Sequence, residues 1–453
     1  MDADKNTRSR RSFLRDAGTL AAASALASTA IPAVHVGEDA AIRLALIGCG
    51  GRGTGAVGDA FSVKGAAIRL VAMADVFEAR LNRSYQNLKK RFGDRTDVPE
   101  DRRFIGFDGY KRAMDCLRPG DVAIFATPPA FRWVHFAYAV EKGIHVFMEK
   151  PVTVDGPTTR KMLELAEKSK KKDLKVGVGL MVRHCRGRRQ LWDRIRSGEI
   201  GDIVCMRAYR MGGRAAATGP KPAAMSELLY QVQRFHSFLW ASGGVYSDFY
   251  IHQIDECSWM KGDWPVRAHA LGGRHYRGDA VDQNFDVYSV EYVYPDGTRL
   301  FFDGRNMAGC HEEFASYVHG TNGAAIVSTS AHYPGRVRTF RSHTLSESDL
   351  LWAFPQPEPN PYQLEWQDLL EAIREDKPYN EVERGAMASL VTAMGRMAAH
   401  TGRIVTLDEM RNCPHEFAPD VDKLAMDSAP PLAAGPDGRY PVPEPGVKKD
   451  REY

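Results

Sequence analysis

Lys150 stands where a predicted strand ends, in the short motif Glu149-Lys150-Pro151. Pro151 favours an extended conformation for the residue before it, so we expect the Lys150 amine to lie at the strand end rather than inside a helix. A lysine desolvated in such a position can take up or release a proton at neutral pH. The alternative is an exposed surface charge, and the lysine taken without its context favours that alternative.

An acid and an imidazole recur at helical spacing in the stretch 243–259. In a helix, Asp248, His252 and Asp255 share one face because they stand at i, i+4 and i+7. An acid beside an imidazole can relay a proton. The alternative is a helix whose histidine is a hydrogen-bonded interior group. H-E-x-x-H is absent and no third ligand cluster appears, so no metal site is predicted.

A glycine-rich turn opens the regular pattern of the chain. The nearly continuous apolar run 42–47 predicts a parallel strand covered on both faces. Gly48, Gly50 and Gly53 then match G-x-G-x-x-G, in which the turn, the approach of a pyrophosphate and helix–strand packing each need a glycine. The helix that follows would point its first N–H groups at the phosphates. Glycine-rich turns are common, so this motif alone is weak.

A second apolar run, 70–74, ends in Asp75, roughly 20 residues beyond the last glycine of the motif. An acid at that place can hydrogen-bond a ribose 2′-OH and repel a 2′-phosphate. The two motifs together predict NAD as the cofactor and make NADP less favoured. Arg80 lies nearby in sequence and could soften that preference.

Strand and helix patterns alternate up to about residue 179. The predicted strands are 42–47, 69–75, 121–127, 144–149 and 174–178, and the predicted helices are 53–62, 77–91, 109–117, 131–142 and 156–171. This alternation indicates an α/β fold with right-handed βαβ units and a parallel sheet, whose ligands bind at the carboxyl ends of the strands. Gly48, Asp75, Thr127 and Glu149 stand at those ends.

The pattern changes beyond residue 183. Alternating runs predict strands at 203–209, 266–271, 286–294, 299–303, 316–319 and 325–328, with a hairpin turn at 294–298 and helices at 188–196, 362–375 and 382–400. These elements indicate a mostly antiparallel sheet that packs one face on helices and leaves the other face open.

Composition and cysteine usage bound the class of protein. The chain has 453 residues, 43% hydrophobic and 26% charged, which fits a globular protein of two or three domains. The net charge is +4 and no basic tract is interleaved with aromatics, so no nucleic-acid partner is predicted. Seven scattered cysteines without a C-x-x-C pair predict neither a disulfide framework nor a zinc site.

The N-terminus is typical of an export signal. Paired arginines within 9–15 precede Phe13-Leu14 and an alanine-rich apolar stretch, 17–30, which is too short to be a convincing membrane anchor. We therefore predict a twin-arginine signal peptide and linker at 1–36, a periplasmic location, and no integral membrane segment after signal removal. The alternative is an unprocessed disordered tail.

Taken in order and spacing, the motifs resemble the Gfo/Idh/MocA oxidoreductase family, the group of glucose–fructose oxidoreductase and inositol dehydrogenase. The resemblance covers about 42–408, and Glu-Lys-Pro with Asp-x-x-x-His is much more specific than the glycine motif. It rests on the glycine turn, Ala126-Thr127-Pro128-Pro129 with His135, Glu149-Lys150-Pro151, and Gly243-Gly244 followed by Asp248-x-x-x-His252-x-x-Asp255.

The resemblance implies a Rossmann domain and an open α/β domain whose sheet face forms homodimers or homotetramers. It also implies hydride transfer between NAD(P) and a sugar or cyclitol hydroxyl. By position, Lys150 would polarise the reacting oxygen and hold its proton, and His252 would be the general acid or base. Asp248 would orient that histidine or bind a neighbouring hydroxyl, and Asp255 would be structural.

The expected cofactor and substrate contacts follow from the same motifs. The cofactor residues would be Gly48, Gly50, Gly51, Arg52, Gly53, Asp75, Thr127, Pro128, His135, Glu149 and Lys150. Arg183 and Tyr250 would contact a carbohydrate substrate. Phe249 and Tyr250 replace the small residue that the family often has there, so we expect a narrow or aromatic pocket.

These inferences divide the chain into four parts and leave three functions open. The parts are the signal and linker (1–36), a Rossmann NAD-binding domain (37–180), an α/β domain for substrate and oligomer contacts (181–408) and an extended tail (409–453). The favoured function is an exported NAD-dependent sugar or cyclitol oxidoreductase. The alternatives are a glycosidase or lyase that oxidises a sugar transiently with a captive NAD, and a non-catalytic sugar-binding module.

Overall fold

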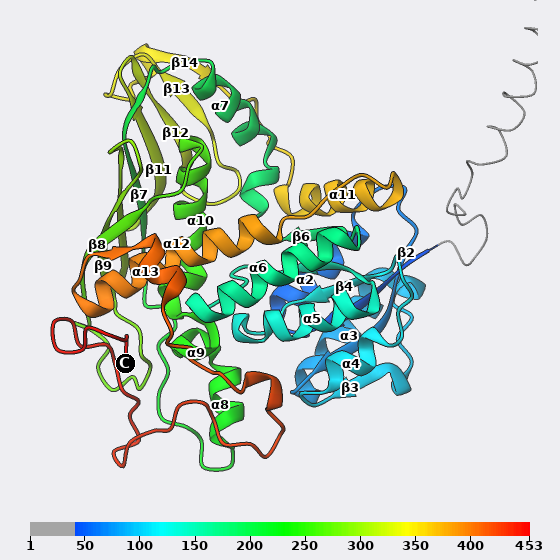
Figure 1. The fold of residues 1–453 in the computed structure, drawn as a ribbon. Helices are drawn as coiled ribbons and strands as arrows, with labels where there is room; N and C mark the ends of the chain where they lie inside the picture. Colours follow the sequence, from blue (N-terminus) through cyan, green and yellow to red (C-terminus); the bar gives the residue numbers. More distant parts are fainter. Residues whose placement is uncertain (1–40) are drawn as a thin grey trace, which may run out of the picture. The chain divides into compact units, whose positions relative to one another are not determined.

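The alternating first part of the chain forms a six-stranded parallel sheet in a computed structural model that describes residues 41–453 (Figure 1). The expected signal peptide at 1–36 lies outside the described residues. The strand order is β3-β2-β1-β4-β5-β6. The strands are β1 (Ile42–Ile47), β2 (Ile68–Asp75), β3 (Arg103–Ile105), β4 (Val122–Phe125), β5 (His145–Met148) and β6 (Val176–Val178).

Helices cover both faces of this sheet, as its apolar strands require. Alternate residues of β1 show the division: Ala45 and Ile47 pack in one core, and Leu44 and Leu46 pack in another. The first core includes α4 (Gly109–Met114), α5 (Arg132–Lys142) and α6 (Gly156–Lys171); the second includes α2 (Gly51–Phe61), α3 (Glu78–Phe92) and α11 (Pro361–Arg374). The predicted dinucleotide-type sheet is therefore confirmed.

A nine-stranded sheet follows, in the order β14-β13-β12-β11-β7-β10-β9-β8-β15. Its neighbours pair antiparallel except β7 with β10, which are parallel. The strands are β7 (Ile203–Gly212), β8 (Arg267–Gly273), β9 (Val287–Val293), β10 (Arg299–Asn306), β11 (Glu313–Gly320), β12 (Gly323–Thr329), β13 (Arg338–Phe340), β14 (Leu350–Ala353) and β15 (Val405–Thr406).

One face of the second sheet is packed and the other is open, as predicted. The packed face meets α10 (Gly244–Lys261) and α12 (Val382–Thr401) through residues such as Met206 and Phe302. The open face leaves Leu271 77% and Phe301 43% exposed. The remaining helices are α7 (Arg186–Arg196), α8 (Glu227–Gln233), α9 (Leu239–Ser242) and α13 (Leu407–Asn412). No helix in 41–453 is long and apolar enough to cross a bilayer.

The stretch after α13 has little regular structure but packs on its own chain. Phe417 and Tyr440 join the core that covers the first sheet, next to α5 and α6. Glu452 is buried and pairs with Arg396 and His400 of α12. The surface that these side chains cover belongs to the same chain.

Candidate active site

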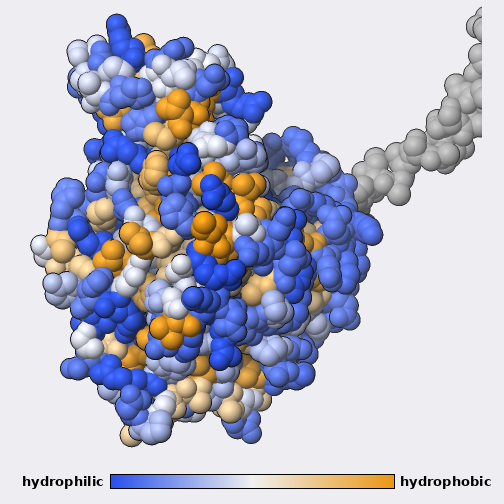
Figure 2. All heavy atoms as spheres, turned by 60° about the vertical axis from the view of Figure 1, so that its left-hand side comes forward, coloured by the Kyte–Doolittle hydropathy of each residue, from blue (hydrophilic) through white to orange (hydrophobic). Residues whose placement is uncertain are grey.

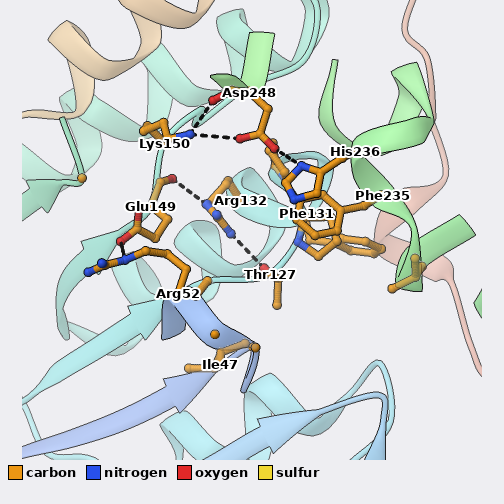
Figure 3. A pocket seen from close by; sticks show the side chains of 18 of the residues that line it. Ile47, Arg52, Thr127, Phe131, Arg132, Glu149, Lys150, Phe235, His236 and Asp248 are labelled. Carbon is orange, nitrogen blue, oxygen red and sulfur yellow. Dashed lines mark hydrogen bonds and ion pairs between the residues drawn. The ribbon is translucent and has the colours of Figure 1, made fainter. Parts of the chain in front are cut away.

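A cavity of about 580 Å³ lies where the carboxyl ends of the parallel strands meet α10. The predicted residues in its lining are Gly48, Gly50, Gly51, Arg52, Asp75, Thr127, Pro128, His135, Glu149, Lys150, Asp248 and His252. Figure 3 shows Lys150 and Asp248 approaching each other from the two halves of the chain, with Glu149 and Arg52 below them. Three predicted residues, Gly53, Arg183 and Tyr250, do not line the cavity.

The glycine turn has the close packing that its motif predicts. Gly48 has a φ of +95°, and a Cβ there would lie 2.6 Å from the main-chain carbon of Ala126. A Cβ on Gly53 would lie 2.1 Å from the carbonyl oxygen of Gly48, so any side chain would push α2 away from β1. Gly53 thus acts on the cavity indirectly, by letting the N-terminus of α2 reach the strand ends.

Asp75 ends β2 and braces the glycine turn. Its Oδ2 accepts a hydrogen bond from the Cys49 N–H at 2.7 Å, and its Oδ1 accepts one from the Phe77 N–H at 2.9 Å. Burial raises the pKa of the Asp75 carboxyl, and these two donors and Arg80 oppose that rise. Arg80 lines the same end of the cavity. The acidic side chain of Asp75 and the basic side chain of Arg80 therefore both line the end of the cavity next to β2.

Two arginines, the half-buried Arg52 and the buried Arg132, hold the strand ends on the floor of the site. Arg52 donates from Nε to Glu149 Oε1 at 2.7 Å and from Nη2 to Asp59 at 2.9 Å. Arg132, which the sequence patterns missed, donates to the Glu149 carbonyl oxygen at 2.9 Å and to Thr127 Oγ1 at 3.0 Å. Arg132 thereby ties the end of β4 to the end of β5 (Figure 3).

His135 lines the cavity as a neutral group. It is 5% exposed and packs against the rings of Tyr110, Phe125 and Phe131. Burial, with a smaller contribution from Arg132, lowers the pKa of His135 to about 3. This imidazole can therefore contact a ligand by packing and hydrogen bonding but carries no charge at neutral pH.

Asp248 joins two basic groups from other elements. Lys150 Nζ donates to Asp248 Oδ1 at 3.1 Å and to the Asp248 carbonyl oxygen. His236, which the sequence patterns also missed, pairs through Nδ1 with Asp248 Oδ2. Burial would raise the pKa of the Asp248 carboxyl, but Lys150 and His236 hold it well below its ordinary value. The carboxylate is thus ionised. Figure 3 shows it between Lys150 and His236.

The predicted Asp248–His252 relay is wrong. Both residues lie on α10, but within the part of the chain that the structure describes no hydrogen bond joins them, and Asp248 turns to Lys150 and His236. His252 instead packs its ring on His332, with centroids 4.2 Å apart, and its Nδ1 is buried without a partner. Burial, then His332, Lys150 and nearby arginines, lower the pKa of His252 well below its ordinary value.

The two predicted substrate contacts lie outside the cavity. Arg183 makes a two-point ion pair with Asp255, at 2.9 and 2.7 Å. Asp255 thus has the structural contact that we expected, and Arg183 is its partner instead of a substrate contact. Tyr250 is fully buried on the face of α10 that meets the second sheet, where its hydroxyl accepts from Asn306 Nδ2. The next residue back, Phe249, lines the cavity and supplies the aromatic wall that we predicted.

Metal ligands are a separate question. No group of three or more His, Cys, Asp or Glu side chains within 41–453 is arranged to hold a metal ion. The polar groups that converge on the cavity are instead a lysine, a shared carboxylate, imidazoles and arginines. That set can bind hydroxyl or anionic groups and move a proton.

Three curated bacterial proteins are similar to parts of this chain. It is 23% identical over 195 residues to the rhizopine catabolism protein MocA of Rhizobium meliloti, covering 43% of this chain and 55% of that protein. It is 24% identical over 262 residues to scyllo-inositol 2-dehydrogenase (NAD(+)) of Bacillus subtilis, covering 57% and 69%. Glycosyl hydrolase family 109 protein 1 of Akkermansia muciniphila is 28% identical over 172 residues, covering 36% and 32%. The matched region thus spans about half of the rhizopine protein and a third of the glycosyl hydrolase.

Solved structures share the fold over most of the chain. Aldose-aldose oxidoreductase from Caulobacter crescentus superposes with a TM-score of 0.61 at 17% identity, covering 81% of this chain and 99% of that chain. Scyllo-inositol dehydrogenase from Lactobacillus casei, with bound NAD(H) and scyllo-inositol, superposes with a TM-score of 0.59 at 19% identity, covering 81% and 99%. At these identities the likeness concerns the arrangement of the two sheets.

Family models match both halves of the chain. Residues 42–179 match the oxidoreductase family with an NAD-binding Rossmann fold, and residues 189–326 match the GFO/IDH/MocA C-terminal domain. Together the matches cover more than half of the 453 residues. They follow the order of the parallel sheet and the open sheet and include the glycine turn, Lys150 and Asp248. The chain belongs to the Gfo/Idh/MocA family of oxidoreductases.

Proposed function

We propose that this protein transfers a hydride between NAD and a hydroxyl or ketone of a sugar or cyclitol. The observation that carries the proposal is one cavity with two distinct ends. The glycine turn and Asp75 line one end, and Lys150 paired with Asp248 lines the other. A nucleotide site joined to a proton-handling site is what such an oxidoreductase needs.

The residues present fit a dinucleotide. The volume of about 580 Å³ falls within the range of small-molecule sites. The N-terminus of α2, at Gly51, faces this cavity and offers unpaired N–H groups for a pyrophosphate. Asp75 at the end of β2 favours a ribose 2′-OH over a 2′-phosphate, so NAD is the proposed cofactor, with NADP disfavoured.

The proton chemistry belongs to the protein. NAD, when bound, supplies the hydride acceptor or donor. Lys150 is placed to contact the reacting oxygen and to hold its proton, and Asp248 stabilises the positive charge on that amine. His236, whose side chain is 38% exposed, connects the same carboxylate toward solvent. His252 faces the cavity as a neutral imidazole that can hydrogen-bond a neighbouring hydroxyl.

The test of this proposal is a spectral assay on a panel of sugars and cyclitols, with scyllo-inositol, myo-inositol and aldoses each added to protein with NAD. Absorbance at 340 nm should rise with at least one of them. Lys150→Ala should lower turnover about 10²- to 10⁴-fold, the range for a lost general base, while NAD binding stays intact. Lys64→Ala, an exposed lysine beyond α2, is the control. Normal turnover in Lys150→Ala would remove the proposed role.

A second function, transient oxidation of a sugar with elimination and re-reduction on a captive NAD, is favoured by the match to a glycosyl hydrolase family 109 protein. The two functions differ in whether NAD leaves the protein. Denaturing the purified protein and assaying the supernatant separates them. Stoichiometric NAD together with cleavage of an aryl glycoside supports the second function, and NADH accumulation during turnover supports the first.

We also propose export by the twin-arginine route and a periplasmic location, on the basis of the paired arginines in 9–15. Replacing Arg10 and Arg11 by lysine should retain the protein with its full N-terminus inside the producing cell. Fractionation followed by mass spectrometry of the N-terminus measures this. Unchanged export of the Lys variant contradicts the proposal.

The open face of the second sheet is the proposed contact for a homodimer or homotetramer. Figure 2 turns the side of the second sheet forward and shows apolar patches among hydrophilic ones. Phe301 and Leu271 are exposed on that sheet. Light scattering after size exclusion should give a multiple of the monomer mass, and Phe301→Glu should reduce it. A wild-type monomer at micromolar concentration contradicts the proposal.

A further inference from the structure

Arg210 is a cation in the cavity without a carboxylate partner. It lies on β7 and lines the cavity together with Lys150 and His252. Arg52 and Lys150, in the same lining, each face a carboxylate. Within the part of the chain that the structure describes, Arg210 contacts the ring of Phe314, 4.2 Å from its guanidinium carbon, and His332. No acidic side chain within 41–453 forms an ion pair with it.

His332 adds a second hydrogen-bond donor beside Arg210. Arg210 Nη1 lies 3.5 Å from His332 Nε2, and because a guanidinium only donates, that imidazole nitrogen is the acceptor. The proton of the neutral ring therefore sits on Nδ1, which is buried without a partner. His332 and Arg210 thus offer a planar guanidinium beside an unused N–H donor.

Two histidines and Arg210 lie close together in this part of the cavity: the ring centroids of His252 and His332 are 4.2 Å apart, and Arg210 Nη1 lies 3.5 Å from His332 Nε2. Burial, then Arg210 and other cations, lower the pKa of His332 well below its ordinary value. Burial, then His332, Lys150 and Arg210, do the same to His252. Both imidazoles are therefore neutral, and an anion placed beside them would pair with the guanidinium of Arg210 and accept a hydrogen bond from the free N–H of His332. A neutral sugar would leave the guanidinium of Arg210 without an anionic partner.

We propose that the substrate carries a carboxylate, bound by Arg210 and His332, beside the hydroxyl that faces Lys150. This inference rests on the proposed function and names its substrate class as acidic sugars, uronates or aldonates. A planar guanidinium matches a carboxylate with two parallel hydrogen bonds. A phosphate can bind a guanidinium with the same geometry, so the sugar phosphate in the test below separates the two anions.

The test compares matched acidic and neutral sugars on the NAD-loaded protein. The pairs are D-glucuronate with D-glucose, D-galacturonate with D-galactose and D-mannuronate with D-mannose, with D-gluconate and D-glucose 6-phosphate added. The readouts are kcat/KM from absorbance at 340 nm and Kd from calorimetry. In the wild type, at least one acid should exceed its neutral partner by about 10- to 100-fold, the range for a charge-assisted hydrogen bond.

Three variants assign that preference to Arg210. Arg210→Gln should bring the acid-to-neutral ratio close to one, and Arg210→Lys, which keeps the charge but loses the fork, should retain part of it. Arg207→Gln removes the same charge from the opposite face of β7, where Arg207 stacks on Tyr317, and should leave the ratio unchanged. NAD content and thermal melting confirm that each variant is folded.

The outcomes separate this inference from the proposed function. Preference for the neutral sugars, equal use of both members of every pair, or a stronger preference for the sugar phosphate would overturn the inference. Turnover of a neutral sugar with NAD would then leave the proposed function standing. A protein that binds no NAD would refute the proposed function, and calorimetric binding of the uronates would still measure the acid preference.

Discussion

Glu452 is a carboxylate whose contribution to the free energy of unfolding can be calculated directly from the structure. It is buried, it accepts from Arg396 at 2.8 and 2.9 Å, and its Oε2 lies 2.6 Å from His400 Nδ1. Burial would raise its pKa, but Arg396 and His400 lower it to about 2. Arg396 also donates to Ser247 Oγ at 2.7 Å, next to Asp248 on α10. Loss of Glu452 would therefore leave an unpaired buried guanidinium beside the site.

Glu452→Gln should lower the free energy of unfolding at pH 7 by about 3 kcal/mol. A carboxyl whose pKa falls from its ordinary value of 4.5 to about 2 contributes about 3 kcal/mol when ionised. Breaking a buried ion pair by removing one partner costs about 3–5 kcal/mol, in agreement. Because the folded-state pKa is depressed, this contribution is complete above pH 4.5 and disappears as the pH falls through about 2.

Urea unfolding followed by tryptophan fluorescence measures the change, with Glu444→Gln, an exposed residue of the same segment, as the matched control. Arg396→Met and the double variant complete a double-mutant cycle. The double variant should lower the free energy of unfolding clearly less than the sum of the two single changes. A loss below about 1 kcal/mol for Glu452→Gln, or additivity within about 0.5 kcal/mol, would refute the reasoning.

Three further predictions concern the site. Asp75→Ala should weaken NAD binding and bring the NAD-to-NADP affinity ratio toward one, as measured by fluorescence titration; an unchanged ratio removes Asp75 from cofactor choice. His135 has a pKa of about 3 in the folded protein and 6.5 ordinarily, so its protonation in the unfolded chain lowers the free energy of unfolding as the pH falls below 6.5. His135→Phe should therefore reduce the slope of the free energy of unfolding against pH by up to about 1.4 kcal/mol per pH unit between pH 6 and 4. Parallel curves for the wild type and the variant would contradict this. Arg183→Met should cost about 3 kcal/mol of stability because it strands Asp255, with substrate KM unchanged; a raised KM without destabilisation would restore Arg183 to substrate binding.

The parallel half of the fold was predictable because each of its signals is local. The apolar run 42–47 coincides with β1, and the capping box at Asp155 with Thr158 begins α6 where the sequence places it. The strands that escaped prediction, β3, β13, β14 and β15, have two to four residues each. Runs that short show no period of two, and their pairing depends on neighbours from distant parts of the chain.

The candidate site was predictable where residues stand at the ends of strands or at helical spacing within α10. Asp75 is the last residue of β2 and Lys150 follows β5, and both line the cavity. His236 could not be found because it precedes α10 in a stretch without periodic pattern and meets Asp248 through tertiary packing. Tyr250 was misplaced because the helical argument did not decide which side of α10 faces the second sheet.

The pairing of Lys150 with Asp248 has a kinetic consequence. Lys150 follows β5 of the parallel sheet, whereas Asp248 belongs to α10, which packs on the open sheet. Any motion that parted the two halves would separate this pair. A molecule opened in that way would hold Lys150 without the carboxylate that stabilises its charged form. If a nucleotide exchanged by such opening, the pair would have to re-form before the next turnover.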